Sequence, residues 1–147
     1  MRSYVDRRAG RYIHSKLKMA KKSVYICTPY IDEKYVDELI VLANRKILVR
    51  LVSSSKQAYF DLRDYVLSSA IDYQYFKHLI VPKTDFVHAK ILVVDECYAV
   101  DGSANLTRNG LWDQVNYIHV YDDLKEVHEV INAFEKIWKF NEKYLRQ

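Results

Sequence analysis

The sequence predicts an α/β protein, a three-layer α/β/α sandwich built on a mixed, mostly parallel β-sheet. Runs of β-branched and apolar residues alternate with segments that repeat apolar residues at three- and four-residue steps. In the first half of the 147 residues this alternation indicates parallel strands joined by crossover helices. In the middle, two strand-like runs separated by a short turn indicate an antiparallel pair. Because no Gly/Pro-rich linker, low-complexity tract or repeat interrupts the pattern, we expect a single domain over 1–147.

The first half of the chain begins with apolar residues at helical spacing, including Val5, Ala9, Ile13 and Leu17. Further along, Asp32 has the character of a helix N-cap. The elements expected here are a helix over 3–21, a strand over 23–28, a helix after Asp32 that ends near Asn44, a strand over 46–53 and a helix over 57–69.

The second half is richer in strands. The expected elements are a strand over 73–81, a turn at 83–85, a strand over 86–94, a turn at 95–97, a strand over 98–101, a helix near 104–112, a strand over 116–121 and a helix over 124–144. Asp122 and Asp123 are candidate caps of the last helix. The strand over 86–94 is apolar on both faces, which suits the centre of a sheet.

Composition places the chain among soluble globular proteins, with 50% hydrophobic and 29% charged residues. No apolar run has the length of a membrane span, and the N-terminal residues do not form a signal peptide, so we expect a cytoplasmic protein without a membrane partner. The chain contains two cysteines, Cys27 and Cys97. We interpret them as buried free thiols in a reducing compartment.

The net charge of +4 is unevenly distributed. Residues 1–22 contain eight Lys/Arg and one Asp, which gives +7, whereas the other 125 residues contain 15 basic and 18 acidic side chains, which gives −3. The basic end suits a polyanion such as nucleic acid, and it equally suits a solvated helix face. The 13 tyrosines are suited to stacking on bases, but their spacing favours packing.

One stretch has a pattern that chance does not explain, H-x-K-x4-D-x6-G-S-x-N. Its members are His88, Lys90, Asp95, Gly102, Ser103 and Asn105. In a strand over 86–94, His88 and Lys90 would share a face. The Lys90 ammonium and the Asn105 amide are donors suited to phosphate, and an imidazole serves as nucleophile or general acid. A lone histidine in an apolar strand is usually a core residue, but the joint pattern favours a phosphate site.

This stretch resembles the H-K-D motif of the phospholipase D superfamily, which cleaves or exchanges phosphodiester bonds. The resemblance implies the phospholipase D-like fold and a site built from two motifs. Since this chain has one motif, it looks like the small nucleases of the superfamily that complete the site in a homodimer. By the same resemblance His88 of one subunit is the nucleophile, and His88 of the partner subunit is the acid/base.

The resemblance also implies roles for the other motif residues. Lys90 and Asn105 would bind the non-bridging oxygens, and Ser103 would help to bind phosphate. No metal or other cofactor is implied, and no cluster of metal ligands is evident in the sequence. The turn position of Asp95 suggests a structural role, and Gly102 suits a special backbone geometry.

The sequence departs from the family at Asn116, eleven positions after Asn105. The family usually has a glutamate there, which orients the histidine. The Asn116 carbonyl can accept a hydrogen bond from an imidazole, but it has no charge to stabilise imidazolium. Asp113 is a nearby carboxylate whose spacing is off by three.

Three functions remain open from the sequence. The first is a metal-independent phosphodiesterase or nuclease that acts on DNA or RNA. The second is a catalytically weak or inactive nucleic-acid-binding module of a larger DNA-processing system, which the change at Asn116 favours. The third, ranked lowest because no apolar rim is obvious, is a phospholipase or phosphatidyl-transferase.

Overall fold

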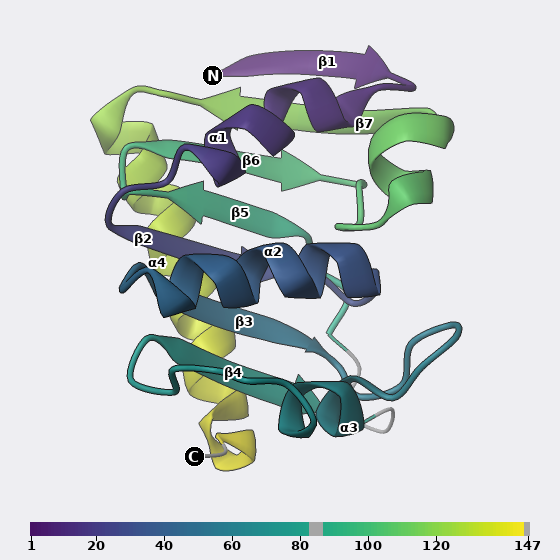
Figure 1. Cartoon of the computed structure of the whole chain (residues 1–147). Coiled ribbons are helices and arrows are strands. Elements are labelled where there is room, and N and C mark those ends of the chain that lie inside the picture. The colour runs from purple at the N-terminus through teal and green to yellow at the C-terminus, as the bar shows by residue number, and fades with distance from the viewer. Residues whose placement is uncertain (83–86, 146–147) are drawn as a thin grey trace.

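The computed structural model describes residues 1–82 and 87–145, in which seven strands form one sheet in the order β1-β7-β6-β5-β2-β3-β4 (Figure 1). The strands are β1 Arg2–Asp6, β2 Ser23–Cys27, β3 Leu48–Ser54, β4 Phe76–Val81, β5 Ile91–Val94, β6 Tyr98–Gly102 and β7 Asn116–Tyr121. The sheet is mixed, as predicted. β1, β2, β3, β4 and β6 run in one direction, and β5 and β7 run in the other.

The prediction of a mostly parallel sheet is correct in that five of the seven strands run in the same direction, but most adjacent strands are antiparallel. Only β2–β3 and β3–β4 pair in parallel, whereas the other four pairs are antiparallel. The reason is that the β5–β6 hairpin lies beside β2, and β7 and β1 add to that side in alternating directions. The parallel part of the sheet is therefore confined to the segment with long helical crossovers.

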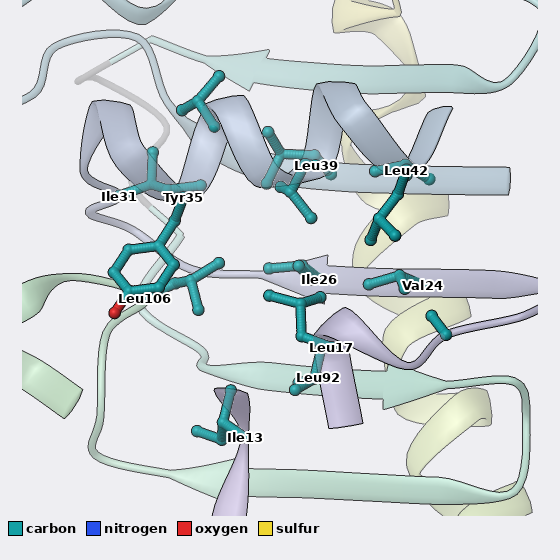
Figure 2. Close-up of a cluster of buried hydrophobic side chains, with 14 of the residues drawn as sticks. Ile13, Leu17, Val24, Ile26, Ile31, Tyr35, Leu39, Leu42, Leu92 and Leu106 are labelled. Atoms are coloured by element: carbon teal, nitrogen blue, oxygen red, sulfur yellow. The ribbon is translucent and has the colours of Figure 1, made fainter. Parts of the chain in front are cut away.

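Helices cover both faces of the sheet, which confirms the three layers (Figure 1). The helices are α1 His14–Lys18, α2 Glu33–Asn44, α3 Leu62–Leu67 and α4 Leu124–Asn141. On the α2 side, Leu17, Tyr35 and Leu39 pack with Val24 and Ile26 (Figure 2). On the α4 side, Phe134 and Trp138 pack with Tyr25. Because β2 alternates between two cores, all five of its residues are buried.

The prediction of a helix over 3–21 is wrong at its start. Residues Arg2–Asp6 form the edge strand β1, paired with β7, and only the later part is helical, as a 3₁₀ helix Ala9–Tyr12 followed by α1. The free edge of β7 supplies backbone partners that no local pattern reveals. Ala9, Ile13 and Leu17 are nevertheless buried in the α2-side core, so the apolar spacing identified the right face.

Other boundaries also changed. The helix expected over 57–69 is confined to α3, and the strand expected over 73–81 begins at Phe76. The helix expected near 104–112 is a π-helix Asn109–Asp113. The turn expected at 83–85 lies outside the described residues. The turn at 95–97 is confirmed, with Asp95 and Glu96 both at positive φ of 54° and 55°.

The two cysteines differ in exposure. Cys27 is buried in β2, as expected, but Cys97 is exposed in the β5–β6 turn, so the prediction that both thiols are buried is wrong for Cys97. Over the described parts of the chain, no helix combines the length and apolar character that a bilayer crossing requires.

We predict that His78 makes folding sensitive to mild acid. His78 is 4% exposed, and burial, with a smaller contribution from the Arg63 charge, lowers its pKa from 6.5 to about 4. Between pH 6.5 and about 4, His78 is therefore protonated in the unfolded chain but stays neutral in the folded chain. The free energy of unfolding should fall by up to about 3 kcal/mol as the pH drops through that window.

Urea unfolding between pH 7 and 4.5 measures this decline. His78→Leu should flatten it, because that side chain does not titrate, whereas removing the exposed His128 as His128→Gln serves as the matched control. Parallel pH profiles for the wild type and His78→Leu would contradict the prediction.

Candidate active site

The motif residues lie where the ends of several strands meet, with one exception. We call this side of the sheet, which runs across the strand ends, the site edge. β2, β3 and β6 end at this edge, and β5 and β7 begin there, because those two strands run in the opposite direction (Figure 1, right). His88 and Lys90 come directly before β5, Ser103 and Asn105 directly after β6, and Asn116 is the first residue of β7. Gly102 is the last residue of β6, so the topology brings six of the seven predicted residues to the same edge.

His88 and Lys90 are not on a strand, so the prediction that a strand places them on one face is wrong. β5 begins at Ile91, which is paired with Cys27 on one side and Asp101 on the other. β2 ends at Cys27, so β5 has no partner on that side before Ile91. The exposed His88 is instead joined to Lys90 by a local contact, since the Lys90 ammonium donates to the His88 carbonyl over 2.9 Å.

Lys90 lines a small cavity of about 30 Å³ between β2, β5 and β6, together with Cys27, Thr28, Gly102 and Ala104. Burial lowers the pKa of Lys90. Burial also raises the pKa of Cys27 to about 12, although the nearby Lys90 charge opposes that shift, so the thiol stays protonated. A half-buried ammonium has lost part of its hydration, so a neighbouring anion stabilises its charged form. Lys90 is therefore electrostatically suited to bind a phosphate.

Gly102 fixes the path of the chain from β6 into the site. Its φ is 142°, and a Cβ at this position would lie 2.1 Å from the Tyr117 carbonyl oxygen. The next residue exploits that close approach: the Ser103 N–H donates to the Tyr117 carbonyl at 2.9 Å, and the Ser103 hydroxyl accepts from the Tyr117 N–H at 3.0 Å. The geometric role expected of Gly102 agrees with this arrangement.

Asn116 is 8% exposed, and its amide is used to hold the loop that carries Ser103. Its Oδ1 accepts from the Ser103 hydroxyl at 2.8 Å, and its Nδ2 donates to the Gly110 carbonyl at 2.7 Å. Asn116 thus links β7 to the π-helix and to Ser103. The glutamate that the family usually has at this position could not donate a hydrogen bond to the Gly110 carbonyl through an ionised carboxylate. The asparagine amide therefore suits the local hydrogen bonds of this chain. Asp113 is exposed on the π-helix.

Thr28 is a residue of the site that the sequence reasoning missed. Its hydroxyl donates to the Tyr30 carbonyl at 2.7 Å, accepts from the Leu106 N–H at 3.0 Å, and lies 3.5 Å from the Asn105 Oδ1. An isolated bridge between Ile31 and Leu106 continues this contact. Thr28 therefore fixes the Asn105 loop against the end of β2. The signal in the sequence was a buried strand that ends in Thr-Pro.

Asp95 is the exception, because it lies at the opposite edge, where β5 ends. Its carboxylate accepts from the backbone N–H groups of Lys21, Lys22 and Ser23, at 3.1, 2.7 and 3.1 Å. Burial alone would raise the pKa of Asp95, but these hydrogen bonds outweigh it and lower the pKa. The contacts agree with the structural role that the turn position suggested.

Part of the basic N-terminal segment reaches the site edge. Asp6 at the end of β1 is paired with Asn116, so Arg7 and Arg8 follow at that edge. Arg8 lies over the Trp112 ring at 5.8 Å, and Arg7 donates to the Asp113 carbonyl at 3.5 Å. Both are exposed, which adds positive potential at that edge of the sheet. Within the described residues no cluster of three or more His, Cys, Asp or Glu side chains could hold a metal ion.

The fold and the motif together define a phospholipase D-like domain, and comparison with known proteins agrees. The family model described as "Cardiolipin synthase, PLD-like domain" matches residues 13–138. The chain therefore belongs to the phospholipase D superfamily, as its motif predicted.

Curated relatives are larger than this chain. It is 31% identical over 129 residues to cardiolipin synthase 1 of Bacillus cereus and 31% identical over 132 residues to cardiolipin synthase 1 of Staphylococcus epidermidis. These matches cover 82% and 85% of this chain, but only 24% and 26% of the relatives. The chain thus spans about a quarter of the length of the curated relatives it matches.

Solved structures of similar fold include proteins of similar size. NucT from Helicobacter pylori has a TM-score of 0.72 at 16% identity, with 94% of each chain covered. Nuc from Salmonella typhimurium, a phospholipase D family member, has a TM-score of 0.70 at 14% identity, covering 99% of this chain and 97% of that one. TrmBL2, an archaeal chromatin protein, has a TM-score of 0.62 at 15% identity, covering 95% of this chain and 52% of that one.

We predict that Asp95→Asn lowers the free energy of unfolding by about 1–2 kcal/mol at pH 7, because hydrogen bonds to an ionised acceptor are stronger than those to a neutral one. Asparagine tolerates the positive φ at this position, so the substitution removes the charge and one acceptor oxygen without adding backbone strain. Because the folded pKa of Asp95 is lowered, the difference should shrink as the pH falls below about 4.

The measurement is urea unfolding at pH 7 and at pH 3. Asp122→Asn, which removes an exposed carboxylate near the end of β7, is the control for net charge. Equal midpoints for the two variants at pH 7 would show that the Asp95 carboxylate has no special role.

Proposed function

We propose that this chain is a metal-independent phosphodiesterase that cleaves nucleic acid, with an active site completed by a second copy of the chain. The observation that carries the proposal is the placement of the single motif at one edge of the sheet, with Lys90 lining the same cavity as Gly102 and Ala104. Family membership supports phosphodiester chemistry, and the absence of a second motif supports a C2 homodimer.

In the proposed reaction, a neutral imidazole nitrogen of His88 attacks phosphorus, and the bond to the leaving oxygen breaks. His88 of the partner subunit gives its proton to that oxygen, so a phosphohistidine and an alcohol result. The partner's imidazole then takes a proton from water, the resulting hydroxide attacks phosphorus, and His88 is released. Lys90 and Asn105 from both subunits hold the non-bridging oxygens, where charge develops in the transition state.

Two further observations favour nucleic acid as the substrate. Arg7, Arg8 and Arg108 are exposed beside the motif, where they can contact phosphates that flank the scissile one. TrmBL2, which shares the fold, is an archaeal chromatin protein that binds DNA. The site would therefore engage an extended polyanion and more than one phosphate at a time.

A specific observation favours each alternative. The 31% identity to cardiolipin synthases favours phosphatidyl transfer, and the Asn116 amide, which supplies no charge to an imidazolium, favours a weak or inactive nucleic-acid-binding module. Incubation with phosphatidylglycerol vesicles separates the first alternative from the nuclease. Salt-dependent DNA binding without cleavage identifies the second.

The catalytic proposal predicts cleavage of DNA or RNA in the presence of EDTA. His88→Ala should reduce the rate at least about 100-fold because it removes both the nucleophile and the acid/base. Lys90→Ala should reduce kcat with retained folding. His128→Ala, an exposed histidine on α4, is the matched control. Cleavage by His88→Ala at the wild-type rate would place the activity elsewhere.

The shared site predicts a dimer at micromolar concentration. Light scattering should give twice the chain mass of 17.5 kDa, about 35 kDa, in the range of concentrations that supports activity. A monomer that remains fully active upon dilution would contradict the requirement for a second His88.

A further inference from the structure

A hollow of about 460 Å³ lies beside the motif, and the catalytic proposal does not use it. Asn105 lines one side, and most of the other lining residues come from the loops that follow β2, β3 and β6. Its volume falls within the roughly 300–1,000 Å³ of small-molecule sites. Because Asn105 is a proposed phosphate ligand, whatever enters the hollow is next to the reacting phosphate.

The hollow combines aromatic rings with polar groups. Tyr59, Tyr30 and Phe60 line it, together with Arg108 and Gln114. Tyr59 is 94% exposed, and Tyr30 is 44% exposed. A ring with almost its whole surface in water gains free energy when a flat partner covers it, and an exposed guanidinium beside it suits a phosphate.

The loop that carries Tyr59 is held in place by buried hydrogen bonds. Gln57 is 7% exposed, and its Oε1 accepts from the Ile31 N–H at 2.7 Å. Its Nε2 donates to the carbonyls of Pro29 and Ser54, at 3.2 and 2.6 Å. An isolated bridge between Lys56 and Asp61 closes the loop. The Tyr59 ring is therefore presented by an anchored loop that is tied to the same segment as Tyr30.

We propose that this hollow binds one unpaired nucleobase of the substrate, stacked on Tyr59, while the adjoining phosphate lies at Asn105. This inference rests on the proposed function, and it assigns single-stranded nucleic acid as the substrate class. Every base has a face that can stack on an aromatic ring, so the contact tolerates any sequence. The Gln114 carboxamide and the Arg108 guanidinium can donate to base edges or phosphate.

The same features disfavour the two competing substrates. In a duplex the base faces are covered by their neighbours, so Tyr59 cannot stack on them without an unpaired nucleotide. A diacyl lipid needs a continuous apolar wall, whereas this hollow is interrupted by Asp32, Gln57 and Thr107. An unpaired base matches both the flat aromatic surface and the polar groups around it.

The first test compares cleavage of three 20-mers in EDTA: a single strand, a duplex, and an abasic single strand in which every nucleotide lacks its base. We expect the single strand to be cleaved at least about tenfold faster than the duplex. Tyr59→Ala should lower kcat/KM on the single strand by about 5- to 150-fold, the loss of one stacked base. For the wild-type protein, kcat/KM should be lower on the abasic strand than on the normal single strand by a similar factor. On the abasic strand, Tyr59→Ala should lower kcat/KM little further.

Two variants control the interpretation. Tyr59→Phe keeps the ring and should retain most of the wild-type kcat/KM on the single strand. Phe140→Ala removes a ring that is 80% exposed on α4, outside the hollow, and should leave kcat/KM unchanged. Equal losses for Tyr59→Ala on the normal and abasic strands would overturn the stacking proposal, as would a preference for duplex.

A second measurement separates this inference from the catalytic proposal. Fluorescence anisotropy with His88→Ala protein measures binding of the same 20-mers without cleavage. The base site predicts that His88→Ala protein binds the abasic strand more weakly than the normal strand, and that this difference disappears in the double variant His88→Ala/Tyr59→Ala. That result supports the base site even if no cleavage is found. Identical affinities for the normal and abasic strands would overturn the base site even if cleavage is robust.

Discussion

The hydrogen bonds between the Asp95 carboxylate and the start of β2 fix the register on which the candidate site depends. The carboxylate accepts from three consecutive backbone N–H groups, and the Asp95 N–H donates to the Ser23 carbonyl at 2.8 Å. These contacts hold the β5–β6 hairpin against β2. Because both ends of a short strand move together, the register at Asp95 determines where Lys90 and Gly102 lie at the other edge, beside Thr28.

The mixed directions of the strands determine which residues of the candidate site lie at the same edge of the sheet. Had β5 been parallel to β2, its first residue would lie at the opposite edge from the end of β6. The hairpin instead places the start of β5, the end of β6 and the start of β7 side by side. Residues from three separate segments therefore lie at one edge of the sheet without a long loop, and the hydrogen bond between Ser103 and Asn116 joins two of those segments. The site relies on strand ends for its rigidity.

The sequence was sufficient to predict the motif, the three layers and the central strands, because those depend on local spacing and on buried β-branched runs. It was insufficient for β1, since an edge strand owes its structure to β7, more than a hundred residues away. The start of β5 was missed because its neighbour β2 stops at Cys27, a fact about pairing that a run of apolar residues cannot encode. Asn116 could be recognised as a departure, but its partner Gly110 could not be found without coordinates.

The contrast between the two cysteines has a practical consequence. The Cys27 thiol is enclosed and fully protonated at neutral pH, so alkylating reagents have neither access to it nor a thiolate to react with. Cys97 is exposed in the hairpin turn, at the sheet edge remote from His88. The native chain thus offers a single accessible cysteine for a spectroscopic label. Distances between two such labels would report how the two copies in the proposed dimer are oriented, without any engineered change near the motif.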